Sequence, residues 1–339
     1  MKKLVLIDGN AIIHRAYHAL PKTMTTRRGE QTNAVYGFTT TLIKVLENLH
    51  PEYIAASFDL AGPTFRHQQF AEYKATRVKA DQELYDQIPR VKELTEKMNI
   101  PIYEKEGFEA DDCIGTIVSK VESRKSKAGG IEIYIVSGDK DIFQLINSKV
   151  KVYSLRKGLS QMQVVDHDTI KKEYNLEPSD FIDLKALAGD ASDNIPGVPG
   201  IGPKTATQLL QKFDTLEKLY EAIEKSEARN PKSEINSDDQ ISKIKPRILE
   251  LLKKYRDQAF MSQKLATIRR NVPIKFSLEE CKRGEYDKGE LREFFEELGF
   301  RSLLRRFDNS GDKSEIQNSN IETNSKSQIE KKDRQLKLL

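Results

Sequence analysis

The sequence of 339 residues predicts an α/β fold, in which a mostly parallel sheet carries helices on both faces, followed by an all-helical region. In the first half of the chain, short apolar runs alternate with longer segments of helical spacing, and parallel strands require crossover connections of this kind. After Tyr174 the strand-like runs stop, and a segment rich in glycine and proline leads into further helical patterns. These observations indicate a sheet-based first domain and a helical second one.

Four apolar runs are predicted to be strands, at 4–7, 53–58, 131–136 and 150–153. Aspartates follow the first three runs: Asp8, Asp59 and, after a Ser-Gly pair, Asp139, with Asp141 two positions further. A single aspartate of this kind usually marks only a turn. Because the carboxyl ends of parallel strands meet at one edge of a sheet, we expect these side chains to lie close together.

Amphipathic helices are predicted at 12–17, 35–49, 91–98, 181–188, 205–213, 216–223, 247–267 and 294–307. A further helix, beginning at residue 110 or 111, is acidic at its start: Glu109, Asp111 and Asp112 lie within four consecutive positions. The helix dipole alone would explain this arrangement. Asp190 and Asp193 are three positions apart around a helix end and can therefore point the same way.

Convergence of these acids would require cations. Two carboxylates about 4 Å apart repel by about 4 kcal/mol at an effective dielectric of 20, and several such pairs exceed a domain's net stability of about 5–15 kcal/mol. A set of oxygen ligands selects Mg²⁺ or Mn²⁺, and the number of acids suggests two or more ions. Paired ions about 3.5–4 Å apart suit hydrolysis of a phosphodiester. The sequence therefore favours a metal-dependent nuclease over a solvated acidic edge.

The composition excludes several other classes of protein. The chain has only two cysteines, Cys113 and Cys281, which form neither a zinc motif nor a disulfide framework and fit a reducing, cytoplasmic setting. His14 and His18 are four apart, but no third ligand accompanies them. We expect no membrane segment, because no apolar run approaches spanning length. The net charge of +4 is compatible with a nucleic-acid partner.

Two further segments suggest phosphate contacts. The run from Gly197 to Lys204 predicts a tight turn opening onto a helix, whose backbone N–H groups could hold a phosphate; an ordinary turn is equally compatible. Pro203 interrupts the pattern that an ATP-binding P-loop requires. Lys74 and Arg77 could stabilise a transferring phosphoryl group, and the adjacent aromatic ring could stack on a base, although a solvated basic face would have the same pattern.

Taken in order, the motifs resemble a known family. They lie at 6–10, 15–19, 58–59, 64–66, 73–77, 107–112, 137–141, 189–204 and 298–304. Over almost all of residues 3–307 the sequence is similar to the 5′–3′ exonuclease domain of bacterial DNA polymerase I and its flap endonuclease relatives. The resemblance implies a PIN-like nuclease core and a helix-hairpin-helix-type DNA-binding subdomain. It also implies two-metal cleavage of DNA at 5′ flaps, nicks or RNA-primed ends, leaving a 5′-phosphate and a 3′-hydroxyl.

The resemblance also assigns roles to individual residues. It implies a first metal held by Asp8, Asp59, Glu109, Asp111 and Asp112, and a second held by Asp139, Asp141, Asp190 and Asp193. The catalytic residues it implies are Asp8, Lys74, Arg77, Asp111 and Asp139. The DNA-binding residues expected are Arg15, Tyr73, Lys74, Arg77, Gly197, Gly200, Gly202, Lys204 and Thr205. A K⁺ ion is expected at the carbonyl groups of 197–202.

We expect a nuclease core at 1–173 with a basic and aromatic clamp segment at 64–90, a DNA-binding subdomain at 174–307, and a disordered or linking tail at 308–339. Two segments depart from the family: 78–81 lacks a proline-rich run, and 228–243 looks like a long polar insertion. The implied setting is a bacterial, nucleoid-associated monomer that works with a DNA polymerase in cis or in trans. A PIN-type ribonuclease and a non-catalytic DNA-binding module are the alternative interpretations.

Overall fold

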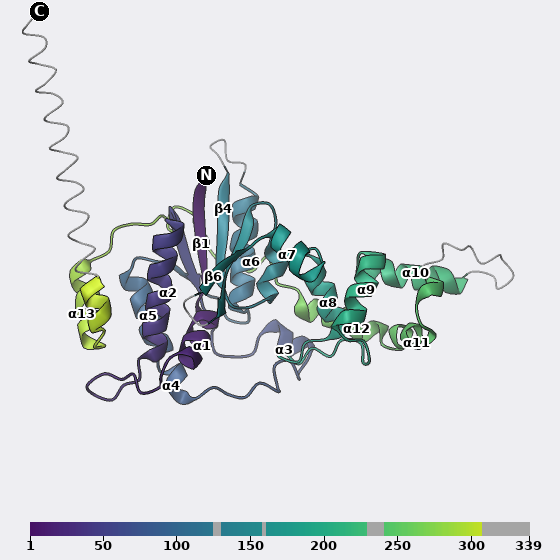
Figure 1. The fold of residues 1–339 in the computed structure, drawn as a ribbon, viewed down its shortest axis with the longest axis horizontal. Helices are drawn as coiled ribbons and strands as arrows, with labels where there is room; N and C mark the ends of the chain where they lie inside the picture. Colours follow the sequence, from purple (N-terminus) through teal and green to yellow (C-terminus); the bar gives the residue numbers. More distant parts are fainter. Residues whose placement is uncertain (125–129, 158–160, 229–240, 307–339) are drawn as a thin grey trace, which may run out of the picture.

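The computed structural model describes residues 1–124, 130–157, 161–228 and 241–306. Its core is a six-stranded sheet with the order β3-β2-β1-β4-β5-β6 and helices on both faces, as predicted (Figure 1). The strands are β1 (Lys2–Asp8), β2 (Tyr53–Ser57), β3 (Ile102–Tyr103), β4 (Ile131–Ser137), β5 (Val150–Lys157) and β6 (Gln161–Val165). The four predicted strands correspond to β1, β2, β4 and β5, which are mutually parallel.

Two strands were not predicted. β3 has only two residues and extends the sheet beside β2, so it is too short to show a pattern. β6 pairs antiparallel with β5, and its sequence, Gln-Met-Gln-Val-Val, alternates too briefly to indicate a strand. The parallel part of the sheet therefore ends at β5, and the edge that matters for the site is formed by β1, β2 and β4.

Side chains alternate between two hydrophobic clusters along the buried strands. Val5 and Ile7 of β1 belong to the cluster that includes residues from α1 (Gly9–Ala19), α2 (Asn33–Leu49), α5 (Ile88–Lys97) and α13 (Lys288–Glu297). Leu4 and Leu6 belong to the cluster on the other face, with α6 (Ala110–Glu122), the 3₁₀ helix η1 (Asp141–Leu145) and α7 (His167–Tyr174). This alternation is the expected consequence of a strand buried on both faces.

A helical subdomain extends to one side of the sheet (Figure 1). It comprises α8 (Asp180–Ala188), α9 (Pro203–Phe213), α10 (Leu216–Ala228), η2 (Ile241–Lys243), α11 (Pro246–Lys254) and α12 (Arg256–Ala266). These elements share a third hydrophobic cluster. Between α8 and α9, the backbone at Gly197 has a φ of 58°, and a Cβ there would lie 2.2 Å from the nitrogen of Gly189. Only glycine fits this turn.

The chain then returns to the sheet. Ile268, Val272 and Ile274 pack in the second hydrophobic cluster, and α13 with Leu303 packs in the first. Residues 268–306 therefore contact the nuclease core rather than the helical cluster, although they fall within the predicted subdomain 174–307. The predicted tail at 308–339 and most of the insertion at 228–243 lie outside the described residues. No described helix is long and apolar enough to span a bilayer.

Candidate metal centre

The carboxyl edge of the sheet brings acidic side chains together, as the sequence predicts. Asp8 ends β1 and caps α1, accepting hydrogen bonds from the nitrogen of Ala11 at 3.1 Å and from the hydroxyl of Ser137 at 2.6 Å. Asp59 follows β2 and accepts from the nitrogen of Ala110, the first residue of α6, at 2.7 Å. The ends of β1, β2 and β4 and the start of α6 therefore meet at one point.

A cavity of about 210 Å³ opens at this edge. Among its lining residues are five of the nine predicted acids: Asp8, Asp59, Glu109, Asp111 and Asp139. The lining also includes Asn10, His14, Lys74 and Arg77. The predicted convergence of three strand ends with the acidic helix start is thus confirmed, and the two predicted phosphate-contacting cations lie in the same cavity.

Four of these acids form no ion pair within the described residues. Within the described parts of the chain, no lysine, arginine or histidine forms an ion pair with Asp8, Asp59, Asp111 or Asp139. Burial, together with the charges of Asp59 and Asp139, raises the pKa of Asp8 to about 7. Burial raises the pKa of Asp111 well above its ordinary value, and Asp8 and Asp139 add to this effect.

These observations fit a divalent cation. The described residues contain no ready-made group of three acidic, histidine or cysteine ligands, since the carboxylates turn toward backbone and side-chain donors. Nevertheless, crowded carboxylates whose pKa is raised by burial and by mutual repulsion are stabilised by added positive charge. All their donor atoms are oxygens, which are the ligands that Mg²⁺ and Mn²⁺ prefer.

The metal-free protein is expected to lose stability as the pH rises. Asp8 keeps its proton up to about pH 7 in the folded state but releases it near pH 3.8 when unfolded, so the folded state binds more protons in this window. The free energy of unfolding therefore falls as the pH rises from about 4 to 7. Thermal melts in EDTA should show a fall that is smaller in Asp8→Asn than in the wild type. An equal fall in both proteins would contradict this origin.

Asp112 is placed differently from Asp111. It has 0% exposure, and its two oxygens accept hydrogen bonds from the Arg66 guanidinium at 2.8 and 2.9 Å. The backbone nitrogens of Glu109 and Arg269 also donate to it, at 3.1 and 2.8 Å. Asp112 therefore does not line the cavity. It fixes the loop that carries Glu109 and ties the start of α6 to the segment after α12.

Tyr73 is also placed differently from the stacking surface that the sequence suggested. Its ring has 2% exposure, and its hydroxyl donates to Glu109 at 3.2 Å and to Asp193 at 2.9 Å. Burial and the charges of these two acids raise its pKa. A buried ring cannot stack on a base, so Tyr73 instead links an acid of the core to an acid of the helical subdomain.

Lys74 and Arg77 hold the outer acids of the cavity. Lys74 contacts Glu109 at 2.8 Å, and Arg77 contacts Asp193 at 2.5 Å. Lys74 has a φ of 57°, a left-handed conformation that is uncommon for residues with a side chain, and its nitrogen donates to the carbonyl of Asp193 at 2.9 Å. The clamp segment is thereby attached both to the acidic cavity and to the turn after α8.

The two remaining acids share a residue that the sequence analysis missed. The ammonium of Lys185 contacts Asp141, in η1, and Asp190, in the turn after α8. A neighbouring cavity of about 500 Å³ is lined by these three residues together with Asp139 and Arg15, among others. The sequence contained no signal for Lys185, because its partners lie on different elements.

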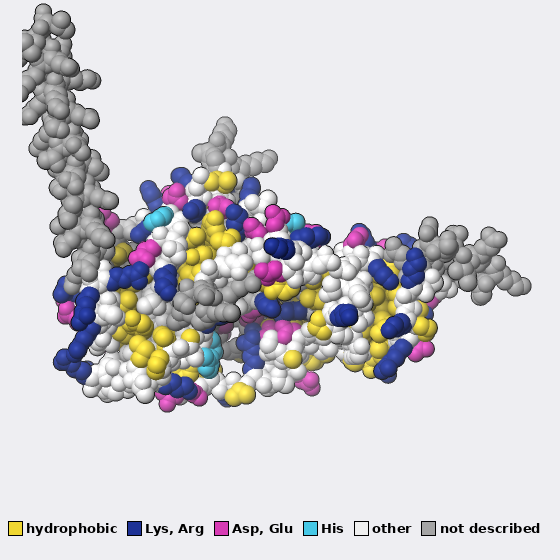
Figure 2. Space-filling view, viewed as in Figure 1, with side chains coloured by type: hydrophobic (Ala, Val, Ile, Leu, Met, Phe, Trp, Pro, Cys, Tyr) yellow, Lys and Arg dark blue, Asp and Glu magenta, His cyan; other side chains and the backbone are white. Residues whose placement is uncertain are grey.

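The predicted turn at 197–204 opens onto a helix, as expected from the sequence. Gly200 has a φ of 87°, Gly202 caps α9, and Pro203 begins that helix, with Lys204 exposed and Thr205 beside it in the first turn. Lysine and arginine side chains are spread over the helical subdomain that carries this turn (Figure 2). A role of these residues in phosphate binding stays a prediction.

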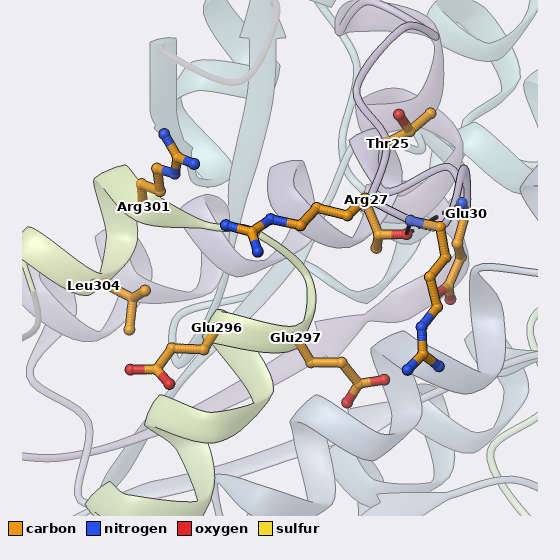
Figure 3. A pocket seen from close by; sticks show the side chains of 10 residues that line it. Thr25, Arg27, Glu30, Glu296, Glu297, Arg301 and Leu304 are labelled. Carbon is orange, nitrogen blue, oxygen red and sulfur yellow. Dashed lines mark hydrogen bonds between the residues drawn. The ribbon is translucent and has the colours of Figure 1, made fainter.

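A second, larger cavity of about 770 Å³ shares no lining residue with the acidic cavity. Figure 3 shows it from close by. It is formed by the hairpin after α1 and the end of α13, and it is lined by Thr25, Thr26, Arg27, Arg28, Glu30, Glu296, Glu297, Gly299, Arg301 and Leu304. Figure 3 shows Arg27 reaching across the opening toward the segment that carries Arg301 and Leu304. The sequence did not indicate this cavity, because its two walls are about 270 residues apart in the chain.

The three arginines that line this cavity form no ion pairs within the described residues, whereas its glutamates do. Glu30 and Glu297 both contact Arg90, and Glu296 contacts Arg292. Among the described residues, no acid forms an ion pair with the three lining arginines, Arg27, Arg28 and Arg301. The glutamates of the lining are therefore engaged in ion pairs, whereas these three guanidinium groups are not.

Comparisons with known proteins agree with this geometry. The family profile described as 5′-3′ exonuclease, N-terminal resolvase-like domain, matches residues 3–175, and that described as 5′-3′ exonuclease, C-terminal SAM fold, matches 176–289. DNA polymerase I of Bacillus subtilis is 41% identical over 305 residues, covering 90% of this chain and 32% of the relative. DNA polymerase I of Bacillus caldotenax is 39% identical, covering 93% and 33%.

Solved structures show the same fold. A structure of the bacteriophage T5 5′-exonuclease with bound zinc has 17% identity and a TM-score of 0.59, covering 91% of this chain and 98% of that one. The catalytic core of Rad2 with a DNA substrate has 17% identity and a TM-score of 0.54, covering 88% of each chain. The chain spans about a third of the length of the curated relatives that it matches. On the match of both profiles, the chain belongs to the 5′-3′ exonuclease family.

Proposed function

We propose that the chain is a Mg²⁺- or Mn²⁺-dependent, structure-specific 5′–3′ exonuclease and 5′-flap endonuclease. It cleaves DNA at flaps, nicks and RNA-primed ends and leaves a 5′-phosphate and a 3′-hydroxyl. The observation that carries the proposal is the cavity in which Asp8, Asp59, Asp111 and Asp139, which form no ion pair with any described residue, lie with Lys74 and Arg77. Such a cavity, in a chain of this family, combines a site for divalent cations with groups that bind a phosphate.

Asp8, Asp59, Asp111 and Asp139 would hold the first ion, with Glu109 at its margin. The sequence assigned Asp139 to the second ion, but Asp139 lines both the acidic cavity and the neighbouring one. Asp141, Asp190 and Asp193 would contribute to the second. When bound, such ions lower the pKa of a water and offset charge on the phosphate. Lys74 and Arg77 orient the scissile phosphate and stabilise the charge that develops on it, while Tyr73 and Asp112 position Glu109. Asp112 thus supports the site through hydrogen bonds rather than from within the cavity.

The hairpin at 197–202 and the first turn of α9 would bind phosphates of the DNA duplex. The carbonyl groups of the hairpin would hold a K⁺ ion that contributes to this contact. The support for this role is a helix start with Gly202 as its cap and Lys204 exposed beside it. We propose that the protein binds DNA as a monomer and acts with a DNA polymerase in cis or in trans, in keeping with its DNA polymerase I relatives.

The arginine-lined cavity would hold the backbone of a strand of the same substrate. Arg301→Ala should weaken DNA binding and reduce the slope of log affinity against log salt by about one, because a phosphate contact is lost. Fluorescence anisotropy at several salt concentrations measures this slope. Lys149→Ala removes an exposed cation at the opposite edge of the sheet and serves as the control. An unchanged slope in Arg301→Ala would rule out a phosphate contact at this cavity.

Two alternatives are separated by the substrate and by the metal. A PIN-type ribonuclease would cleave single-stranded RNA in preference to a matched DNA flap. A non-catalytic DNA-binding module would bind the flap without cleaving it at any concentration of divalent ion. The proposed nuclease cleaves the DNA flap, and only when Mg²⁺ or Mn²⁺ is supplied.

A further inference from the structure

Lys185 lies between two of the acids that the proposed function assigns to the second ion. Its side chain is only 17% exposed, and its ammonium contacts one oxygen of Asp141 and one of Asp190. Asp141 belongs to η1, directly after β4, whereas Lys185 and Asp190 belong to α8 and the turn that follows it. The ammonium thus occupies the space between two carboxylates from different domains, where a cation shared by both would lie.

One ammonium does not neutralise this part of the site. It carries a single positive charge against two carboxylates, and Asp139 and Asp193 lie near enough to repel Asp141. A divalent ion between the same oxygens would supply twice the charge.

The side chain of Lys185 also has space to move away from Asp141 and Asp190. It lines the cavity of about 500 Å³ together with Asp139, Asp141 and Asp190. A lysine side chain has a flexible four-carbon stem and a single point of charge, so it can move into such a space without disturbing α8. An arginine would hold two carboxylates with a planar fork and would be harder to displace.

We propose that Lys185 is a resident counter-ion of the second acid group, exchanged for a divalent ion when the site is loaded. The inference rests on the proposed function, because it presumes that divalent ions bind at this edge of the sheet. In the absence of DNA, the ammonium competes with the second ion and keeps its affinity low. Once displaced into the cavity, it becomes available to a phosphate of the substrate, so DNA and the second ion strengthen each other's binding.

The test is a titration of the DNA-free protein with Mn²⁺, in which the electron paramagnetic resonance signal of the free ion counts the ions bound. Lys185→Met removes the charge and keeps the length of the side chain, so the second Mn²⁺ should bind at least about tenfold more tightly than in the wild type. Lys185→Arg should bind it no more tightly than the wild type. Lys140→Met, a change of the same kind at a lysine that lines the same cavity but forms no ion pair with any described acid, should alter the affinity less than about threefold.

Several outcomes would overturn the inference. The second ion could bind Lys185→Met no more tightly than the wild type, or Lys140→Met could match Lys185→Met. If Lys185→Met does not fold without metal, Lys185→Arg decides the matter, since tighter binding there contradicts competition by the side-chain charge. Failure of the wild type to bind any Mn²⁺ would instead contradict the proposed function, so the two failures are distinguishable.

Discussion

Replacing Asp111 by asparagine is expected to reduce cleavage of a 5′-flap DNA at least about a hundredfold while flap binding survives. Asp111 lines the cavity and is surrounded by Asp8, Asp59, Asp139 and Asp141, so it stands at the centre of the acidic site. The amide keeps the shape of the side chain but removes one of the charges that attract the ions. The DNA-contacting surfaces on α9 and around Arg301 are left unchanged.

Single-turnover cleavage with saturating Mg²⁺ measures the first effect, and anisotropy in EDTA measures binding. Asp168→Asn is the matched control, because it is the same substitution at an exposed position in the first turn of α7. It should cleave at the wild-type rate. Full activity in Asp111→Asn would refute the assignment of the cavity as the metal centre.

Replacing Arg66 by methionine is expected to lower the free energy of unfolding by about 3–5 kcal/mol. Arg66 is 3% exposed, and besides Asp112 it donates to the carbonyls of Leu265 and Thr267 at 2.9 and 3.0 Å. Its removal leaves the fully buried Asp112 without its cation. The same change releases the link between the start of α6 and the end of α12, so the cavity should also lose its shape.

Urea denaturation in EDTA measures this loss. Adding Asp112→Leu to Arg66→Met should restore much of the stability, because the unpaired buried charge is then gone. Lys218→Met breaks an exposed pair with Asp214 in the helical subdomain and should cost less than about 1 kcal/mol. If Arg66→Met also lowers the free energy of unfolding by less than about 1 kcal/mol, the buried pair of Arg66 and Asp112 contributes little to stability.

The sequence predicted the central acids well because sheet topology dictates their convergence. Asp8 ends a strand and Asp59 and Asp139 each follow one, and the ends of parallel strands must meet at one edge. The start of α6 reaches the same edge because its first residue is capped by Asp59. Strand periodicity and sheet topology therefore predicted the three strand-end acids, whereas they left the position of the helix start open.

The sequence could not show which of the neighbouring acids Asp111 and Asp112 faces the cavity. Successive residues of a helix point about 100° apart, so only one of two neighbouring acids can face the cavity fully. Which one does so depends on Arg66, which lies 46 positions earlier and holds Asp112 in the interior. Lys185 and the arginine-lined cavity were missed for the same reason, because their partners come from distant segments that only the folded chain brings together.

The return of residues 268–306 to the sheet was also not predictable. Their apolar residues could equally have extended the helical cluster that precedes them, and no local pattern shows which core they join. The outcome matters for the site, because the segment after α12 supplies the backbone donor of Arg269 to Asp112. The helical subdomain is therefore attached to the acidic edge at both of its ends.

Cleavage of a labelled 5′-flap DNA by the wild-type protein, first in EDTA and then with added Mg²⁺, tests the central claim most directly. The proposed metal centre predicts no cleavage in EDTA, and with Mg²⁺ it predicts products that end in a 5′-phosphate and a 3′-hydroxyl. Cleavage that persists in EDTA would show that the acidic cavity does not work through metal ions. A flap that is bound but never cleaved, with either Mg²⁺ or Mn²⁺, would show that the protein is a DNA-binding module and not a nuclease.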